Sequence, residues 1–332
     1  MPEWRETIAS DETSRFDRYA AELRALQRAS AQGRPNRRAL HVKAHVGAVG
    51  DLVVPELPAR LRVGPFAQPA TWPCYVRFSN GSPQRQHDGV ADVRGVALKL
   101  VGVPGKKLIA GMENKRTQDF LFIQSQAIPF SGPDDFMTLV RTAAKGKALL
   151  LPRLVGAFGL VRALSLVAKL ARMPKIASMA TSPLFTAVPI RFGDSAAKLS
   201  LLPEAKGPRR GPDGRDGLRA DLIDRLKEAA VTYRLRAQLF VDESVTPIED
   251  ASVVWPEEKS PWHDMGVLHV RQQDVLSARG AEVEALVESL SFDPWHAVEE
   301  LRPLGAIMRA RGSAYRESTI ERKAAAEPER IP

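Results

Sequence analysis

The sequence predicts a single α+β domain built on an antiparallel β-barrel, with helices packed around the barrel. Between His41 and Ile123, patterns typical of strands follow one another closely without a helical pattern between them. Such spacing favours an antiparallel sheet or barrel over crossover connections. No repeat and no break in composition divides the 332 residues. The composition, 44% hydrophobic and 26% charged, is that of an ordinary globular protein.

Charge and cysteine content limit the classes of function. The formal net charge of +9 permits an anionic partner, but lysine and arginine are spread along the chain. No nucleic-acid-binding motif is present, so we expect no nucleic-acid partner. Cys74 is the only cysteine, which excludes an internal disulfide and a cysteine-rich metal site. The N-terminal residues Met1 to Trp4 lack an apolar signal core, which predicts a cytoplasmic protein.

The N-terminal arm, residues 1–35, is predicted to contain one amphipathic helix. It runs from Thr13 to Gln32, and Ser14 can cap its first turn. Apolar side chains recur there at helical spacing: Phe16, Tyr19, Leu23 and Leu26. We expect this helix to pack on the body of the protein or on a partner subunit of a homo-oligomer.

Two histidines four residues apart, His41 and His45, lie in the next segment. The apolar run 51–54 follows closely, which favours a strand in which both histidines share a face with Lys43 between them. A zinc site needs further ligands, and none is evident nearby. Histidines satisfied by hydrogen bonds in a sheet are therefore the simpler interpretation.

Three more strands are predicted before the middle of the chain. Residues 73–81 form a strand that runs into the turn signal Asn80-Gly81. Residues 92–100 form another, in which Gly95 indicates a close backbone approach. Residues 120–123 are a short apolar run suited to a buried strand.

An apolar and basic helical insert is predicted at residues 143–175. Charged residues interrupt it: Arg153, Arg162, Lys169, Arg172 and Lys175. No run reaches the ~18–20 uncharged apolar residues that a membrane-spanning helix needs. We expect one or two helices that face the core or a partner. The functional alternative is peripheral membrane contact by a basic amphipathic helix, from which a lipid substrate could enter.

Strands and helices both recur in the C-terminal half. We expect paired strands at 190–192 and 198–201, an exposed loop at 203–217, a helix at 219–230, strands at 234–241 and 265–270, an extended segment at 250–255, and a helix at 283–290.

The chain from Glu299 to Lys323 is predicted to be mostly helical. Four apolar residues would lie on one side: Leu301, Leu304, Ile307 and Met308. Arg311 and Tyr315 are four residues apart, so their side chains can meet on one helix face. A neighbouring guanidinium stabilises a phenolate, and a phenolate is a recognised ligand of haem iron. An exposed helix with an incidental tyrosine is the alternative.

Five segments, in order, resemble segments of haem catalases. They are Arg38-Ala39-Leu40-His41-Val42-Lys43, Arg77-Phe78-Ser79, Asp92-Val93-Arg94-Gly95-Val96-Ala97-Leu98-Lys99, Val253-Val254-Trp255-Pro256, and Arg311 to Tyr315 with Arg322. The chain resembles in particular the short bacterial catalase-related proteins, a group related to the catalase-fold allene oxide synthases. The resemblance implies a catalase-like β-barrel that carries b-type haem.

The resemblance also implies roles for individual residues. Tyr315 would be the proximal iron ligand, and Arg311 would keep it a phenolate. His41 would be the distal acid–base group, with Ser79 hydrogen-bonded to it and fixing its tautomer. Phe130 is the candidate for an aromatic ring that stacks on the macrocycle, a core phenylalanine being the alternative. Three arginines match positions that pair with the haem propionates: Arg38, Arg77 and Arg322.

The choice of distal histidine rests on spacing. His41 keeps the catalase spacing of three residues from Arg38, and Lys43 follows it as in catalases. The path from His41 to Gly47 is one residue longer than in the catalase pattern, which leaves His45 as the alternative.

One departure from catalases concerns a distal asparagine. Arg116 stands at its position in a gap-free alignment, with Asn114 and Gln118 as candidates to replace the amide. Because that amide helps to orient peroxide, fast hydrogen peroxide disproportionation is in doubt. We expect a haem-dependent peroxidase or catalase-like oxidoreductase acting on hydrogen peroxide or organic hydroperoxides with an unknown electron donor. A fatty-acid hydroperoxide isomerase or dehydratase, and a haem-binding module without turnover, are the alternatives.

Overall fold

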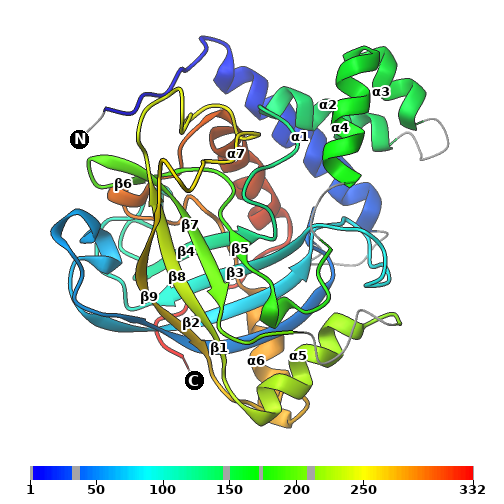
Figure 1. Cartoon of the computed structure of the whole chain (residues 1–332). Helices are drawn as coiled ribbons and strands as arrows, with labels where there is room; N and C mark the ends of the chain where they lie inside the picture. The colour runs from blue at the N-terminus through cyan, green and yellow to red at the C-terminus, as the bar shows by residue number, and fades with distance from the viewer. Residues whose placement is uncertain (1–2, 32–37, 145–149, 172–174, 208–213, 332) are drawn as a thin grey trace.

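Eight antiparallel strands close into a β-barrel at the centre of the molecule (Figure 1). The structure is a computed structural model that describes residues 3–31, 38–144, 150–171, 175–207 and 214–331. The hydrogen-bonded order is β5-β4-β3-β2-β1-β9-β8-β7, and pairing of β5 with β7 closes the ring, while the short β6 extends β7. The strands are β1 (Ala44–Val54), β2 (Ala70–Asn80), β3 (Arg94–Val101), β4 (Thr117–Ile123), β5 (Leu184–Phe185), β6 (Ile190–Phe192), β7 (Ser195–Pro203), β8 (Val231–Leu239) and β9 (Trp262–Val270). The predicted fold class is confirmed.

Helices gather in two groups around the barrel (Figure 1). One group contains α1 (Glu12–Ala31), α2 (Pro133–Ala144), α3 (Leu150–Phe158), α4 (Leu160–Ala171) and α7 (Ala306–Glu321). The second group, on the opposite side in Figure 1, contains α5 (Gly217–Glu228) and α6 (Ala278–Ser289). Short 3-10 turns are η1 (Ala59–Leu61), η2 (Gly64–Phe66), η4 (Met179–Thr181) and η5 (Glu299–Leu301).

Alternation along the strands separates the barrel core from an outer face that carries polar groups. Phe78, Val96 and Phe122 lie side by side on β2, β3 and β4 and belong to the buried apolar core. Their neighbours in sequence therefore point outwards. Two cross-strand rows lie on this outer face: Arg77, Ala97 and Leu121, and Ser79, Gly95 and Ile123.

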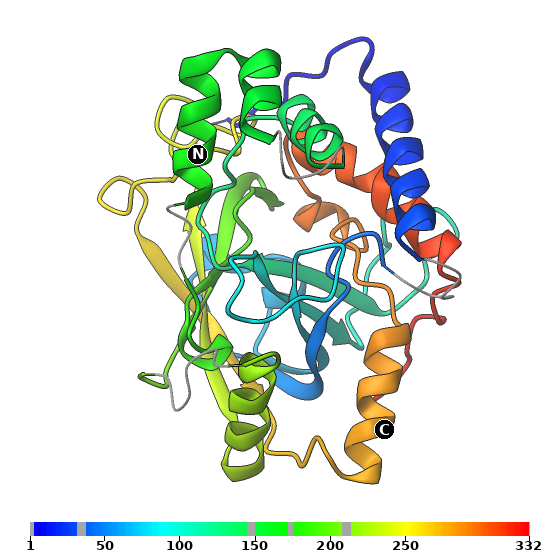
Figure 2. The ribbon, with the colours of Figure 1, turned by 90° about the vertical axis from the view of Figure 1, so that its right-hand side faces the viewer.

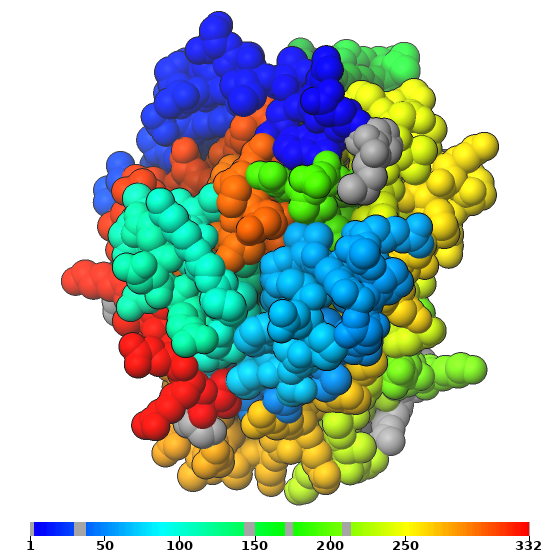
Figure 3. Space-filling model, turned by 90° about the vertical axis from the view of Figure 1, so that its left-hand side faces the viewer, coloured from blue at the N-terminus to red at the C-terminus, as the bar shows by residue number. Residues whose placement is uncertain are grey.

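The N-terminal arm packs along α7 (Figure 2). Arg309 on α7 pairs with Glu6 at 2.5 Å and with Glu12 at 2.8 Å. Arg302 pairs with Glu6 at 2.7 Å, and its guanidinium lies 5.6 Å from the centre of the Trp4 ring. Figure 3 shows this blue N-terminal segment lying against the orange residues near position 300. The arm thus packs on the body of the protein, which was one of its two expected positions.

Three predictions about local backbone structure are wrong: the cap of the first helix, the strand face shared by His41 and His45, and the start of the C-terminal helix. Helix α1 begins at Glu12, so Ser14 lies within its first turn and donates to Asp11 O at 3.0 Å instead of capping the helix. Strand β1 begins at Ala44, after His41, whose φ of 55° is left-handed. His41 and His45 therefore do not share a strand face.

The third correction concerns the helix expected from residue 299. Gly305, with φ of 85°, separates η5 from α7, so Leu301 and Leu304 precede the long helix. A Cβ at Gly305 would lie 2.6 Å from Ile248 O, so glycine is required there both by its backbone conformation and by this close approach. The apolar spacing from Leu301 to Met308 suggested one continuous helix, but the backbone is interrupted at Gly305, where it passes close to Ile248.

Candidate active site

One cavity of about 310 Å³ brings together the eight residues to which the resemblance assigns roles. It lies between the outer face of β2, β3 and β4 and the helices α1, α2 and α7, and most of its lining is apolar. The marked residues that line it are Arg38, His41, Arg77, Ser79, Phe130, Arg311, Tyr315 and Arg322. The barrel register explains part of this set, because Arg77 and Ser79 occupy neighbouring outward positions on β2.

Helix α7 provides a phenol that is hydrogen-bonded to a guanidinium. Arg311 Nη2 donates to Tyr315 Oη at 2.9 Å, and the guanidinium carbon lies 5.2 Å from the centre of the tyrosine ring. This is the contact that the four-residue spacing predicts. A charged donor at this distance stabilises negative charge on the phenol oxygen.

His41 is held at the edge of the cavity by both its backbone and its ring. Its backbone N–H donates to Gly81 O at 3.0 Å, and its Nδ1 lies 3.0 Å from Ser79 Oγ. A Cβ at Gly95 would lie 2.8 Å from His41 Cε1, so only glycine leaves room for this ring. The close approach predicted at Gly95 is therefore confirmed. Within the described residues, no hydrogen bond engages His41 Nε2.

The surroundings of His41 keep its imidazole neutral. Burial lowers its pKa most, and the guanidinium groups of Arg77, Arg311 and Arg38 lower it further, to about 3. A neutral imidazole with one ring nitrogen held by Ser79 can accept a proton on the other.

Three arginines lie around one carboxylate at the C-terminal end of α6, and two of them form ion pairs with it. Arg77 Nε lies 2.9 Å from a carboxylate oxygen of Glu288, and Arg38 Nε lies 3.6 Å from the other. Arg38 and Arg322 also donate to Leu290 O. Burial lowers the pKa of Arg322 to about 10, and burial together with Arg77 and Arg322 lowers that of Arg38 well below its usual value. Three cations facing one carboxylate leave a surplus of two positive charges.

The excess of positive charge at these arginines is accompanied by an unsatisfied hydrogen-bond donor. Arg38 Nε is buried and has no hydrogen-bond partner in the part of the chain that the structure describes. A buried charged donor without an acceptor is costly, and a further carboxylate in the cavity would remove that cost. The arginine cluster thus has the character of a site for a ligand that carries two acidic groups.

The candidates for the distal amide do not reach the cavity. Asn114 and Arg116 are exposed. Gln118 is buried, but its Oε1 accepts from Val298 N at 3.0 Å, and the residue does not line the cavity. Strand β4 contributes Leu121 and Ile123 to the lining at this side.

Gln27 and Glu288 are two of the residues at this site that the sequence analysis did not mark. Gln27 on α1 is the one side-chain amide among the described residues that line the cavity. Glu288 binds Arg77, which is 211 positions away in the chain. The sequence offered no signal for either one, because each lies on a helix predicted only from its apolar pattern.

His45 lies outside the cavity. Its Nε2 is 2.5 Å from Asn80 Oδ1, and its Nδ1 is 3.8 Å from Asp88. The described residues contain no cluster of histidine, cysteine and acidic side chains suited to a metal ion. His45 is therefore a buried, hydrogen-bonded histidine of the sheet, as the simpler interpretation expected.

The part of the insert that the structure describes after residue 149 folds into the hairpin of α3 and α4, in agreement with the expected one or two helices. Phe130 lies between this hairpin and the cavity: its ring centre is 5.4 Å from that of Phe136, and it packs against the hairpin core around Leu154 and Leu166. The role of Phe130 in stacking on a macrocycle stays a prediction. Among the described residues, no helix has the length and apolar character needed to span a bilayer.

Solved structures share this architecture. A fungal catalase aligns with a TM-score of 0.65 at 15% identity over 89% of this chain and 61% of its own. Catalase A from Saccharomyces cerevisiae aligns with a TM-score of 0.64 at 13% identity, over 90% of this chain and 63% of its own. A bacterial catalase aligns with a TM-score of 0.63 at 15% identity, over 91% of this chain and 60% of its own. No protein-family model and no curated protein matches the sequence. The chain spans less than two thirds of each of these catalases, and at such identity the likeness establishes the fold alone.

Proposed function

We propose that this chain, which has a catalase-like fold, is a haem-dependent oxidoreductase that cleaves peroxides. The observation that carries the proposal is the meeting of two hydrogen-bonded pairs in one cavity. Arg311 and Tyr315 come from the C-terminal helix, and His41 and Ser79 come from the first quarter of the chain. A scaffold has no need of both pairs around one apolar cavity.

The residues present fit b-type haem. The apolar lining suits a macrocycle, and the two surplus positive charges at Arg38, Arg77 and Arg322 suit its two propionates. Tyr315 would ligate the iron, and Phe130 would stack on the ring. When bound, haem supplies the redox-active iron needed to break an O–O bond.

The chain's own residues would move the proton. His41 is neutral at physiological pH, so its Nε2 can accept a proton from one oxygen of the peroxide. It would return this proton to the other oxygen as the O–O bond breaks, acting first as general base and then as general acid. Ser79 holds Nδ1 and so determines which ring nitrogen is available. Arg311 donates a hydrogen bond to Tyr315 Oη, the oxygen that would ligate the iron.

The lining favours organic hydroperoxides over hydrogen peroxide. Leu121 and Ile123 line the cavity, whereas Asn114 and Gln118, the candidates for the distal amide, do not. The same apolar lining favours the second candidate function, a fatty-acid hydroperoxide isomerase or dehydratase.

Parallel assays separate these functions. The haem-loaded protein is given hydrogen peroxide, an alkyl hydroperoxide or a fatty-acid hydroperoxide, each with and without an organic electron donor. A peroxidase consumes hydroperoxide only with the donor. An isomerase consumes the fatty-acid substrate without it, and a haem-binding module without turnover consumes none of the three.

The low pKa of His41 predicts a flat pH profile. A histidine whose folded pKa is about 3 gains its proton only near that pH, so the rate constant for reaction with peroxide should stay constant from pH 8 to pH 5. Stopped-flow kinetics measures this, with circular dichroism at each pH as the control for folding. A fall in rate centred near the ordinary histidine pKa of about 6.5 would show that His41 is not held neutral by its surroundings.

We also propose that α4 rests on an anionic lipid surface. Leu160, Val161 and Leu164 are 59%, 83% and 49% exposed. The sequence 145–175 contains seven lysines and arginines and no acidic residue, which complements anionic lipid.

Vesicle sedimentation tests this contact. The protein should sediment with vesicles that contain phosphatidylglycerol more than with pure phosphatidylcholine, and Val161→Glu should reduce the bound fraction several-fold. Leu276→Glu is the matched control, because Leu276 is 69% exposed and lies outside α4. Equal binding of both vesicle types, or equal loss in both variants, would refute the contact.

A further inference from the structure

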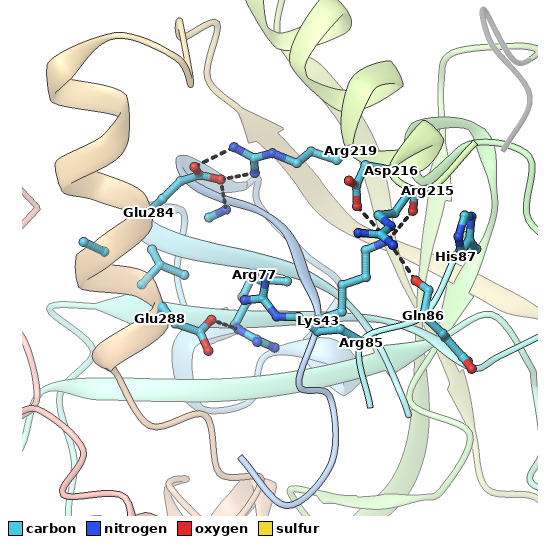
Figure 4. A pocket seen from close by; sticks show the side chains of 14 residues that line it. Lys43, Arg77, Arg85, Gln86, His87, Arg215, Asp216, Arg219, Glu284 and Glu288 are labelled. Atoms are coloured by element: carbon cyan, nitrogen blue, oxygen red, sulfur yellow. Dashed lines mark hydrogen bonds and ion pairs between the residues drawn. The ribbon is translucent and has the colours of Figure 1, made fainter. Parts of the chain in front are cut away.

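A second cavity, of about 680 Å³, lies between α6, the start of α5 and the segment before Asp88 (Figure 4). In contrast to the first cavity, its lining is rich in charged side chains. Arg77 lines both cavities, so the two cavities are neighbours that share this residue. Of the residues that line the second cavity, the functions proposed above use Arg77.

The acidic groups of the second cavity already have cationic partners. On the α6 side, Glu284 receives two hydrogen bonds from Arg219, at 2.5 and 2.8 Å, and Glu288 pairs with Arg77 at 2.9 Å (Figure 4). On the opposite side, Asp216 pairs with the buried Lys43 at 2.9 Å.

Lys43 is itself fully engaged. Its ammonium also lies 2.7 Å from Asp88 and donates to Gln86 O at 3.1 Å and to Arg215 O at 2.6 Å. These bonds hold the segments 86–88 and 215–216 together as one wall of the cavity (Figure 4). The hydrogen bonds and ion pairs of the buried Lys43 ammonium thus hold this wall together without a ligand.

Two guanidinium groups on this wall are left over. Arg85 and Arg215 are exposed, line the cavity and have no ion pair within the described residues. The acids in the lining form their ion pairs with other cations: Asp216 with Lys43, Glu284 with Arg219 and Glu288 with Arg77. Arginine binds carboxylate and phosphate groups bidentately, so two free guanidiniums at one cavity favour an anion.

We propose that the second cavity binds a small organic acid or phosphate ester, with its anionic group on Arg85 and Arg215. The carboxylates of Glu284 and Glu288 across the cavity accept hydrogen bonds, so the rest of the ligand should carry donors such as hydroxyl groups. The site is formed by the chain's own side chains and does not depend on haem.

Calorimetric titration of the full chain tests the proposal. The probes are citrate, which carries carboxylates and a hydroxyl group, and inorganic phosphate. Each is titrated at pH 7 and constant sodium chloride concentration. We expect saturable binding of at least one probe, and the probe that binds identifies the anionic group. The double variant Arg85→Gln and Arg215→Gln should weaken that binding at least tenfold.

The control is Arg60→Gln, which removes an exposed arginine from outside the cavity and should leave the affinity unchanged. Circular dichroism confirms that the variants are folded, which is expected because all three side chains are exposed. No binding of either probe, or equal affinity in the double variant, would overturn the proposal. Neither result would bear on haem binding, which is measured separately by absorption.

Discussion

Replacing Tyr315 by phenylalanine is expected to abolish stable haem binding and, with it, peroxide turnover. The substitution removes one oxygen atom, which is the atom that would ligate the iron and that Arg311 holds at 2.9 Å. No histidine or cysteine on α7 can replace it, because the helix Ala306–Glu321 contains neither. Haem added to the variant should be lost on gel filtration, which the absorbance of the Soret band measures.

Tyr75→Phe is the matched control for this experiment. Tyr75 lies on the same outer face of the barrel, and its hydroxyl donates to Arg330 O at 3.1 Å, away from the cavity. That variant should keep its haem. If Tyr315→Phe kept both haem and activity, Tyr315 would not be the ligand and the assignment of the proximal side would be wrong.

Replacing His41 by alanine should leave haem bound but slow the reaction with peroxide by a factor of about 10²–10⁴, the usual contribution of a general acid–base group. The haem contacts proposed for Arg38, Arg77, Arg322 and Tyr315 do not involve the imidazole. The rate constant of the first step, measured by stopped-flow absorption, is the relevant quantity.

His45→Ala distinguishes catalysis from stability. His45 is buried and bound to Asn80, so its loss should leave a cavity and an unpaired amide oxygen and lower the melting temperature. Its rate constant should stay close to that of the unaltered protein. The opposite pattern, a full rate in His41→Ala and a lost rate in His45→Ala, would reverse the distal assignment.

The parts of the site that depend on short-range spacing could be predicted from the sequence. Arg311 and Tyr315 meet because four residues make one helical turn, and Arg77 and Ser79 share a face because strands alternate. Gly95 marked the point where another group comes close to the backbone, and that group is the ring of His41. Each of these inferences needs only the local conformation of the chain.

The parts that depend on distant segments could not be predicted. Glu288 becomes the partner of Arg77 only after α6 packs beside β2. Lys99 is fully buried between Asp119 and Glu327, 228 positions beyond it, at 2.7 and 2.6 Å. A buried lysine on a strand carries no sequence signal that names its partners, since the same residue type is usually exposed.

Backbone exceptions account for the remaining differences. His41 adopts a left-handed conformation, so it leaves the alternation that would have placed it on a strand face with His45. This turn directs its ring to Ser79 and Gly95. Regular periodicity cannot reveal a residue whose conformation is set by its contacts, and such residues are frequent at functional sites.

The absorption spectrum of the haem-loaded protein tests the central claim most directly. The claim is that a cavity between the barrel and α7 holds haem through Tyr315, with His41 available for proton transfer. It predicts a high-spin ferric spectrum typical of tyrosinate ligation that changes when peroxide is added. A protein that retains no haem, or one with a six-coordinate spectrum that peroxide leaves unchanged, would contradict the account.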